Sequence, residues 1–111
     1  MAINQYLTYE CRTAISVSGS TPSKQLAADI YYKFSSVSSL TLTLPSIVAD
    51  TDEFLFTFTV GDSGTTLAMP SSVEWSRDDV PACTSSEAGR KYVISIQDNI
   101  ALYTYLDPNN E

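Results

Sequence analysis

The chain has 111 residues, with six basic and 13 acidic side chains, no histidine and a net charge of −7. Without histidine it has no Ser-His-Asp triad, no Cys-His dyad and no zinc site with a histidine ligand. The negative charge argues against nucleic acid as a partner, because phosphate binding needs clustered lysine and arginine. No apolar run reaches the roughly 20 residues of a membrane span, so we expect no membrane partner either.

The N-terminal quarter combines a β-rich stretch with a turn-rich one. The first six residues carry neither the basic nor the apolar region of a secretion signal. Residues 6–17 predict one or two strands, and residues 23–28 hint at a single helical turn, because Pro22 is placed like a first helical residue. We expect residues 1–29 to form an extra strand or an arm used in docking or assembly.

The middle of the chain alternates apolar and polar residues, which predicts half-buried antiparallel strands. Residues 39–44 place three leucines on one face and three hydroxyl side chains on the other. Residues 54–60 repeat the pattern with three phenylalanines and a valine, and we expect them to form the central strand. Residues 30–34 predict another strand, in which Tyr31 and Tyr32 must point to opposite faces.

The C-terminal part predicts short strands at 66–69 and 73–75 and two longer ones at 92–96 and 100–106. Asp98 and Asn99 separate the last two strands and tolerate positive φ, so they predict a type I′ hairpin turn. Residues 107–111 read as a polar tail. The segments together predict an all-β fold, with residues 30–106 forming a single antiparallel β-sandwich, jelly-roll or immunoglobulin-like, of about seven or eight short strands.

Two motifs imitate functional sites. Gly61-Asp62-Ser63-Gly64 matches the sequence around the nucleophile of trypsin-like proteases, but that chemistry needs a histidine, so we interpret it as a four-residue hairpin loop. Residues 50–53 hold three carboxylates without the length or glycine of an EF-hand loop, and we expect a solvated acidic loop there. We assign no catalytic residue, no cofactor and no metal ligand, and we expect no enzymatic activity.

The two cysteines, Cys11 and Cys83, leave two interpretations open. They could form a disulfide, or one or both could be small buried apolar residues. The missing secretion signal favours a reducing compartment, in which disulfides are rare.

Aromatic residues are the candidates for molecular contact. The chain has seven tyrosines and one tryptophan, and Tyr31, Tyr103 and Tyr105 lie on predicted strands. Exposed rings on a β-face can stack on sugars or anchor a protein interface. The alternative is that these rings fill the core and pair across strands.

From residue 30 onward, the order of segments resembles a small β-sandwich module of tailed-phage and prophage virion proteins, of head-fibre, decoration or tail-fibre type. The most specific part is the closing segment, residues 87–101, which reads EAGRKYVISIQDNIA. Residues 37–45, 54–61 and 65–70 precede it in the expected order. The resemblance covers about two-thirds of the chain, while residues 1–29 have no counterpart in it.

This resemblance implies a non-enzymatic structural protein of the virion, assembled in the host cytoplasm. The favoured role is a capsid decoration or head-fibre subunit on the particle exterior. The implied partners are the chain itself, as a homo-oligomer with a trimer favoured, and other virion proteins. The alternative is a carbohydrate-binding or receptor-binding module of a phage tail fibre, with a host surface glycan as ligand.

Overall fold

The computed structural model of the chain describes residues 13–76 and 80–108. Cys11 and the first part of the strand predicted at 6–17 lie outside these residues. The described part has no helix long and apolar enough to span a membrane. A 3-10 turn, Ser85–Glu87, precedes the last two strands.

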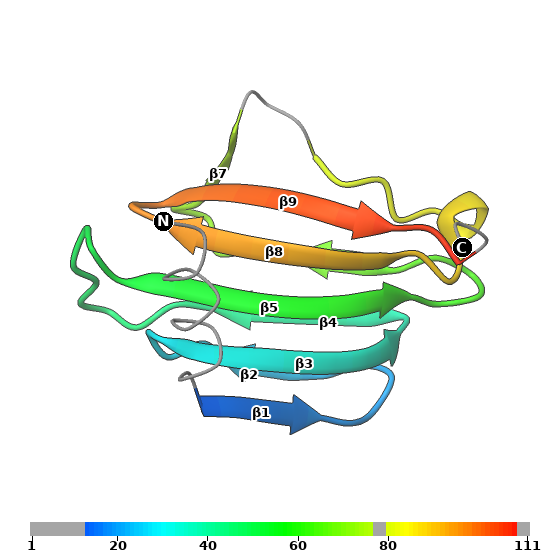
Figure 1. The fold of residues 1–111 in the computed structure, drawn as a ribbon, viewed down its shortest axis with the longest axis horizontal. Helices are drawn as coiled ribbons and strands as arrows, with labels where there is room; N and C mark the ends of the chain where they lie inside the picture. Colours follow the sequence, from blue (N-terminus) through cyan, green and yellow to red (C-terminus); the bar gives the residue numbers. More distant parts are fainter. Residues whose placement is uncertain (1–12, 77–79, 109–111) are drawn as a thin grey trace, which may run out of the picture.

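Over residues 13–76 and 80–108, nine strands form two sheets, which confirms the prediction of a β fold. In chain order they are β1 (Thr13–Val17), β2 (Ser23–Gln25), β3 (Ile30–Val37), β4 (Ser39–Thr43), β5 (Glu53–Val60), β6 (Thr66–Ala68), β7 (Glu74–Trp75), β8 (Lys91–Gln97) and β9 (Ile100–Leu106). The six-stranded sheet has the order β1-β3-β5-β8-β9-β7, and the three-stranded sheet has the order β2-β4-β6. Figure 1 looks onto the six-stranded sheet, with β2 and β4 behind it.

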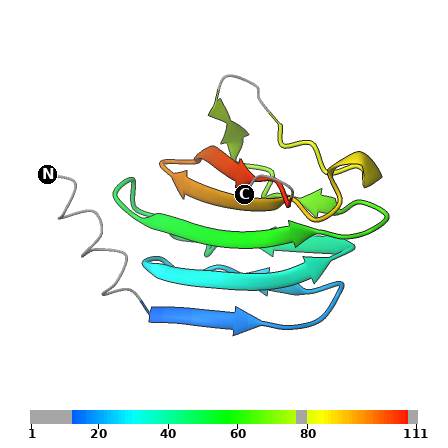
Figure 2. The same ribbon diagram turned by 45° about the vertical axis from the view of Figure 1, so that its right-hand side comes forward.

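The strand pairing differs from the expected antiparallel sandwich. From β1 to β6, consecutive strands alternate between the two sheets, so this part of the chain winds like a coil (Figures 1 and 2). Each turn adds one parallel strand to each sheet, and β1-β3-β5 and β2-β4-β6 are therefore parallel sets. Among the strands that the structure describes, only β5-β8 and β8-β9 are antiparallel, while β7 joins β9 in parallel. The expectation of antiparallel strands, including the one at residues 39–44, was wrong for this half of the chain.

The physical reason is that period-two alternation reports one buried face and not the direction of the neighbouring strand. Parallel neighbours require a crossover of about a dozen residues, which is most often a helix. Here a strand of the other sheet makes the crossover, so no helical signal marks it. For example, β4 and its flanking loops carry the chain from the end of β3 to the start of β5.

The core lies between the two sheets. The predicted central strand is confirmed, because β5 lies between β3 and β8 and buries Phe54, Phe56 and Phe58 completely or nearly so. From the three-stranded sheet, Leu40 and Leu42 of β4 pack against these rings. Tyr32 also points into the core, whereas Tyr31 points to the opposite face, as expected.

Three local predictions have clear outcomes. Asp98 and Asn99 both adopt positive φ, 55° and 61°, which confirms the type I′ turn between β8 and β9. The helical turn expected at 23–28 was wrong, because residues 23–25 form strand β2 beside β4. Residues 13–29 contribute β1 and β2, which are edge strands of the two sheets.

The loop Gly61–Gly64 is a turn between sheets and not the hairpin we expected. It connects β5 in one sheet to β6 in the other, and these two strands do not pair. The Gly61 carbonyl accepts a hydrogen bond from the Gly64 amide at 2.9 Å, which closes the turn. A Cβ atom on Gly64 would lie 2.7 Å from the Cys83 carbonyl oxygen, and its φ is +93°. Glycine is required here by a close approach and by backbone geometry, and not by chemistry.

Candidate functional site

The three candidate tyrosines do not share one surface. Tyr31 lies on the outer face of the six-stranded sheet, the face turned away from the three-stranded sheet, and partial burial raises the pKa of its phenol. Tyr103 and Tyr105 point to the other side of that sheet, where both rings pack on Tyr92, with centroids 5.4 and 5.6 Å from it. The structure therefore brings Tyr103 and Tyr105 together and leaves Tyr31 apart from them.

Arg90 occupies one face of the most exposed of these rings. Its guanidinium carbon lies 4.0 Å from the centroid of Tyr105, a cation–π distance. Its Nε donates to Asp107 at 2.6 Å and its Nη1 donates to the Tyr92 hydroxyl at 3.1 Å. The hydrogen bond to Asp107 is the largest cause of the raised Arg90 pKa. Because the cation covers one face of Tyr105, a sugar ring could stack only on the other face.

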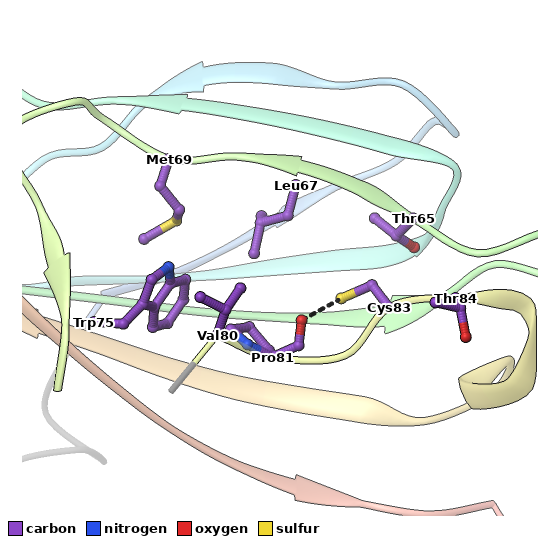
Figure 3. A pocket seen from close by; sticks show the side chains of 8 residues that line it. All are labelled: Thr65, Leu67, Met69, Trp75, Val80, Pro81, Cys83 and Thr84. Carbon is purple, nitrogen blue, oxygen red and sulfur yellow. Dashed lines mark hydrogen bonds between the residues drawn. The ribbon is translucent and has the colours of Figure 1, made fainter. Parts of the chain in front are cut away.

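A hollow of about 360 Å³ opens beside β6, where the three-stranded sheet ends (Figure 3). Its wall is mostly apolar and is formed by β6, Trp75 and the segment after residue 79. The lining residues are Thr65, Leu67, Met69, Trp75, Val80, Pro81, Cys83 and Thr84. This segment is held by a 2.7 Å hydrogen bond from the Thr65 amide to the Cys83 carbonyl and by the Tyr92 hydroxyl, which donates to the Ala82 carbonyl.

The thiol in this hollow is a poor nucleophile. Cys83 is half-buried and lies 3.7 Å from the Pro81 carbonyl, to which its sulfur donates. Burial, and then the nearby Glu87 carboxylate, raise the pKa of the thiol. A raised pKa keeps the sulfur protonated near neutral pH, whereas the thiolate is the reactive form. Among the described residues, no group of three acidic or cysteine side chains could hold a metal ion.

The most distinctive surface is the outer face of β9, which sequence reasoning missed. Ile100, Leu102 and Leu106 point outward and are 49%, 56% and 57% exposed. They make up half of the exposed large hydrophobic side chains among the described residues. The signal in the sequence was that residues 100–106 include apolar side chains at both odd and even positions. A strand with one face in solvent is expected to have polar residues at every second position. Exposed apolar patches of this kind mark protein contacts.

This outer face has opposite charges at its two ends. The register places Lys91 of β8 beside Leu106 of β9, and Gln97 beside Ile100 at the other end. At that second end, Asp50 and Asp98 line a shallow hollow of about 410 Å³ together with Ile100 and Leu102. Between the two ends lie Val93, Ser95, Leu102 and Thr104, none of which is charged. We call the outward residues of β8 and β9 the β8-β9 face; they are Lys91, Val93, Ser95, Gln97, Ile100, Leu102, Thr104 and Leu106.

Comparison of the chain with protein-family models, curated proteins and solved structures finds no match.

Proposed function

We propose that the chain is a non-enzymatic structural protein of a phage virion, most specifically a capsid decoration or head-fibre subunit on the particle exterior. The observation that carries the proposal is the β8-β9 face, where three aliphatic side chains stand about half exposed on a rigid sheet. Such a surface suits contact with protein, because leaving it in water is unfavourable by roughly 25 cal/mol for each Å² of apolar area.

The resemblance to phage virion modules, in residues 87–101, falls on the same part of the chain. This segment contains β8, the type I′ turn and the start of β9. The sequence feature and the exposed surface therefore point to the same place. In this proposal the chain associates with itself and with other virion proteins, and it assembles in the host cytoplasm.

The carbohydrate-binding alternative has less support from the geometry. A glycan platform needs two or three exposed rings that face the same way. Tyr31 lies on the opposite side of the sheet from Tyr103 and Tyr105, and Arg90 covers one face of Tyr105. A lone exposed ring face is a weak sugar site, so we favour assembly over glycan recognition.

The test is to purify particles of the phage or prophage whose genome encodes the chain and to locate the chain in an electron-microscopy map. We expect density for the two-sheet domain on the outside of the capsid or in a head fibre. The matched control is a particle produced without the gene, in which that density should vanish. Particles that lack the chain, or that bury it inside the capsid, would contradict the proposal.

A further inference from the structure

We propose that the β8-β9 face is the contact between two copies of this chain. The two six-stranded sheets, one from each copy, pack face to face. The twofold axis that relates the copies lies between these two sheets and is perpendicular to their strands. The inference deepens the self-association in the proposed function and rests on it, but it specifies a twofold dimer where the resemblance favours a trimer. The partner that binds this face is a second copy of the chain, for three reasons that concern burial, register and charge.

The first reason is the apolar centre of the face. Leu102 is 56% exposed in the middle of β9, and Ile100 and Leu106 are similarly exposed toward the two ends. In a twofold contact each residue is buried by the partner's copy of the same surface. The exposed apolar side chains of β9 would therefore be buried in both copies at once. Sheets that pack in this way keep their strands within about 30° of each other, which a pair of long strands such as β8 and β9 can satisfy.

The second reason is register. The paired residues across β8 and β9 form four outward rows: Gln97 with Ile100, Ser95 with Leu102, Val93 with Thr104, and Lys91 with Leu106. The proposed axis reverses strand direction, so the first row of one copy faces the fourth row of the other. Ile100 then packs on Leu106 of the second copy, and Leu102 faces the row of Val93 and Thr104.

The third reason is charge. The same operation places Lys91 of one copy over Gln97 of the other, at the hollow that Asp50 and Asp98 line. An apolar wall from Ile100 and Leu102 suits the methylene stem of a lysine, while the two carboxylates suit its ammonium group. Among the described residues none of Lys91, Asp50 and Asp98 has an ion-pair partner. The dimer therefore forms two such contacts by symmetry. A parallel arrangement is disfavoured, because it would place Lys91 beside Lys91 and the two aspartates beside their own copies.

The experiment is analytical ultracentrifugation of the full chain over a concentration series. We expect a monomer–dimer equilibrium whose heavy species has twice the chain mass of 12.1 kDa. Leu102→Asp should weaken dimerisation at least about tenfold, because it puts a charge at the apolar centre. The matched control is Val80→Asp, since Val80 is 62% exposed and lines the separate hollow beside β6; it should leave the dissociation constant unchanged.

Charge exchange tests the register. Lys91→Glu and Asp50→Lys should each weaken the dimer, because each brings like charges together, and the double variant should restore much of the loss. Lys24→Glu, on β2 of the other sheet, changes the net charge equally and should have little effect. Circular dichroism of each variant checks that the fold is retained.

Several results would overturn the inference: a monomer at every soluble concentration, a trimer, a dimer that resists Leu102→Asp, or a double variant no better than the single ones. These results are distinguishable from failure of the proposed function. A chain that stays monomeric but is found on the particle exterior refutes the pairing alone. A chain that pairs as described but is absent from particles refutes the virion role alone.

Discussion

At the scale of single residues, two buried threonines are expected to affect the stability of the fold in opposite directions. Thr57 is 1% exposed on β5, and its hydroxyl has no hydrogen-bond partner among the residues that the structure describes. Thr65 is also buried, but its hydroxyl donates to the Val37 carbonyl at 2.6 Å and accepts from the Gly61 amide at 3.2 Å. A buried polar group without a partner is destabilising by about 1–3 kcal/mol, whereas a bonded one contributes about 1 kcal/mol.

We therefore expect Thr57→Val to raise the free energy of unfolding by about 1 kcal/mol and Thr65→Val to lower it by about as much. Valine matches threonine in shape, so packing changes little in either variant. Urea unfolding of both variants beside the unmodified chain measures the two shifts. Equal signs for the two shifts would show that hydrogen bonding of the hydroxyl does not decide the outcome.

Glu87 makes the stability of the 3-10 turn depend on pH. Its carboxylate accepts from the Thr84 hydroxyl at 2.6 Å and from the Thr84 amide at 2.8 Å, and these bonds lower the pKa of Glu87. A carboxyl whose pKa is lower in the folded state stabilises the fold above its unfolded pKa of about 4.3, and this contribution disappears as the pH falls through the folded pKa.

Glu87→Gln should therefore lower the midpoint of thermal unfolding at neutral pH, and the difference should shrink as the pH falls below about 4. Thermal scans at several pH values measure it. Glu74→Gln, an exposed carboxyl on β7, serves as the control for a lost charge. A deficit in Glu87→Gln that stays constant with pH would argue against the capping hydrogen bonds as its cause.

At the scale of elements, the segment from Val80 to Thr84 lies beside β6, and its Cys83 packs against the core. Two contacts hold it: the Thr65 amide donates to the Cys83 carbonyl, and the Tyr92 hydroxyl donates to the Ala82 carbonyl. The Tyr92 ring is 1% exposed and packs on Phe58 at 5.6 Å, so it stays in place when only its hydroxyl is removed.

Tyr92→Phe should therefore loosen this segment with little change to the sheets. The expected loss in the free energy of unfolding is about 1–2 kcal/mol, since the variant leaves the Ala82 carbonyl without its donor and the Arg90 Nη1 without this acceptor. Hydrogen exchange should speed up more at residues 82–85 than in β5, where only the global loss of stability acts. Tyr105→Phe is the control, because it removes the hydroxyl of another, half-exposed tyrosine whose ring packs on Tyr92. Uniform acceleration over the whole chain would instead mean global destabilisation.

The sequence predicted most elements and missed how they connect. The phenylalanines of β5, the leucines of β4 and the Asp98-Asn99 turn follow local rules, because burial of one face and positive φ leave marks in the chain itself. Strand direction leaves no such mark, so the parallel coil of β1 to β6 was not predictable from alternation. The β8-β9 face was missed for a related reason: Ile100, Leu102 and Leu106 look like core residues until the register shows that they point outward.

At the scale of the whole molecule, the coiled topology sets a slow folding rate. Each parallel pair joins strands that are separated by a full turn of the chain, as in Thr13 beside Ile30 and Tyr31 beside Leu55. The loop-closure entropy of such contacts must be overcome before they contribute stability, so folds dominated by them fold in milliseconds to seconds. Only the β8-β9 hairpin forms from residues adjacent in sequence.

We therefore expect stopped-flow refolding of this chain to take about milliseconds to seconds, despite its small size. Trp75 is a convenient probe, because it is the single tryptophan and its ring packs on Tyr103 at 5.8 Å only when β7, β8 and β9 are assembled. Its fluorescence change should follow the same time course as circular dichroism of the sheets. A fluorescence change completed in microseconds, ahead of the sheet signal, would show that the C-terminal strands fold independently of the coil. Folding as one unit is expected instead because β8 pairs along its length with β5, the last strand that the coil adds to the six-stranded sheet.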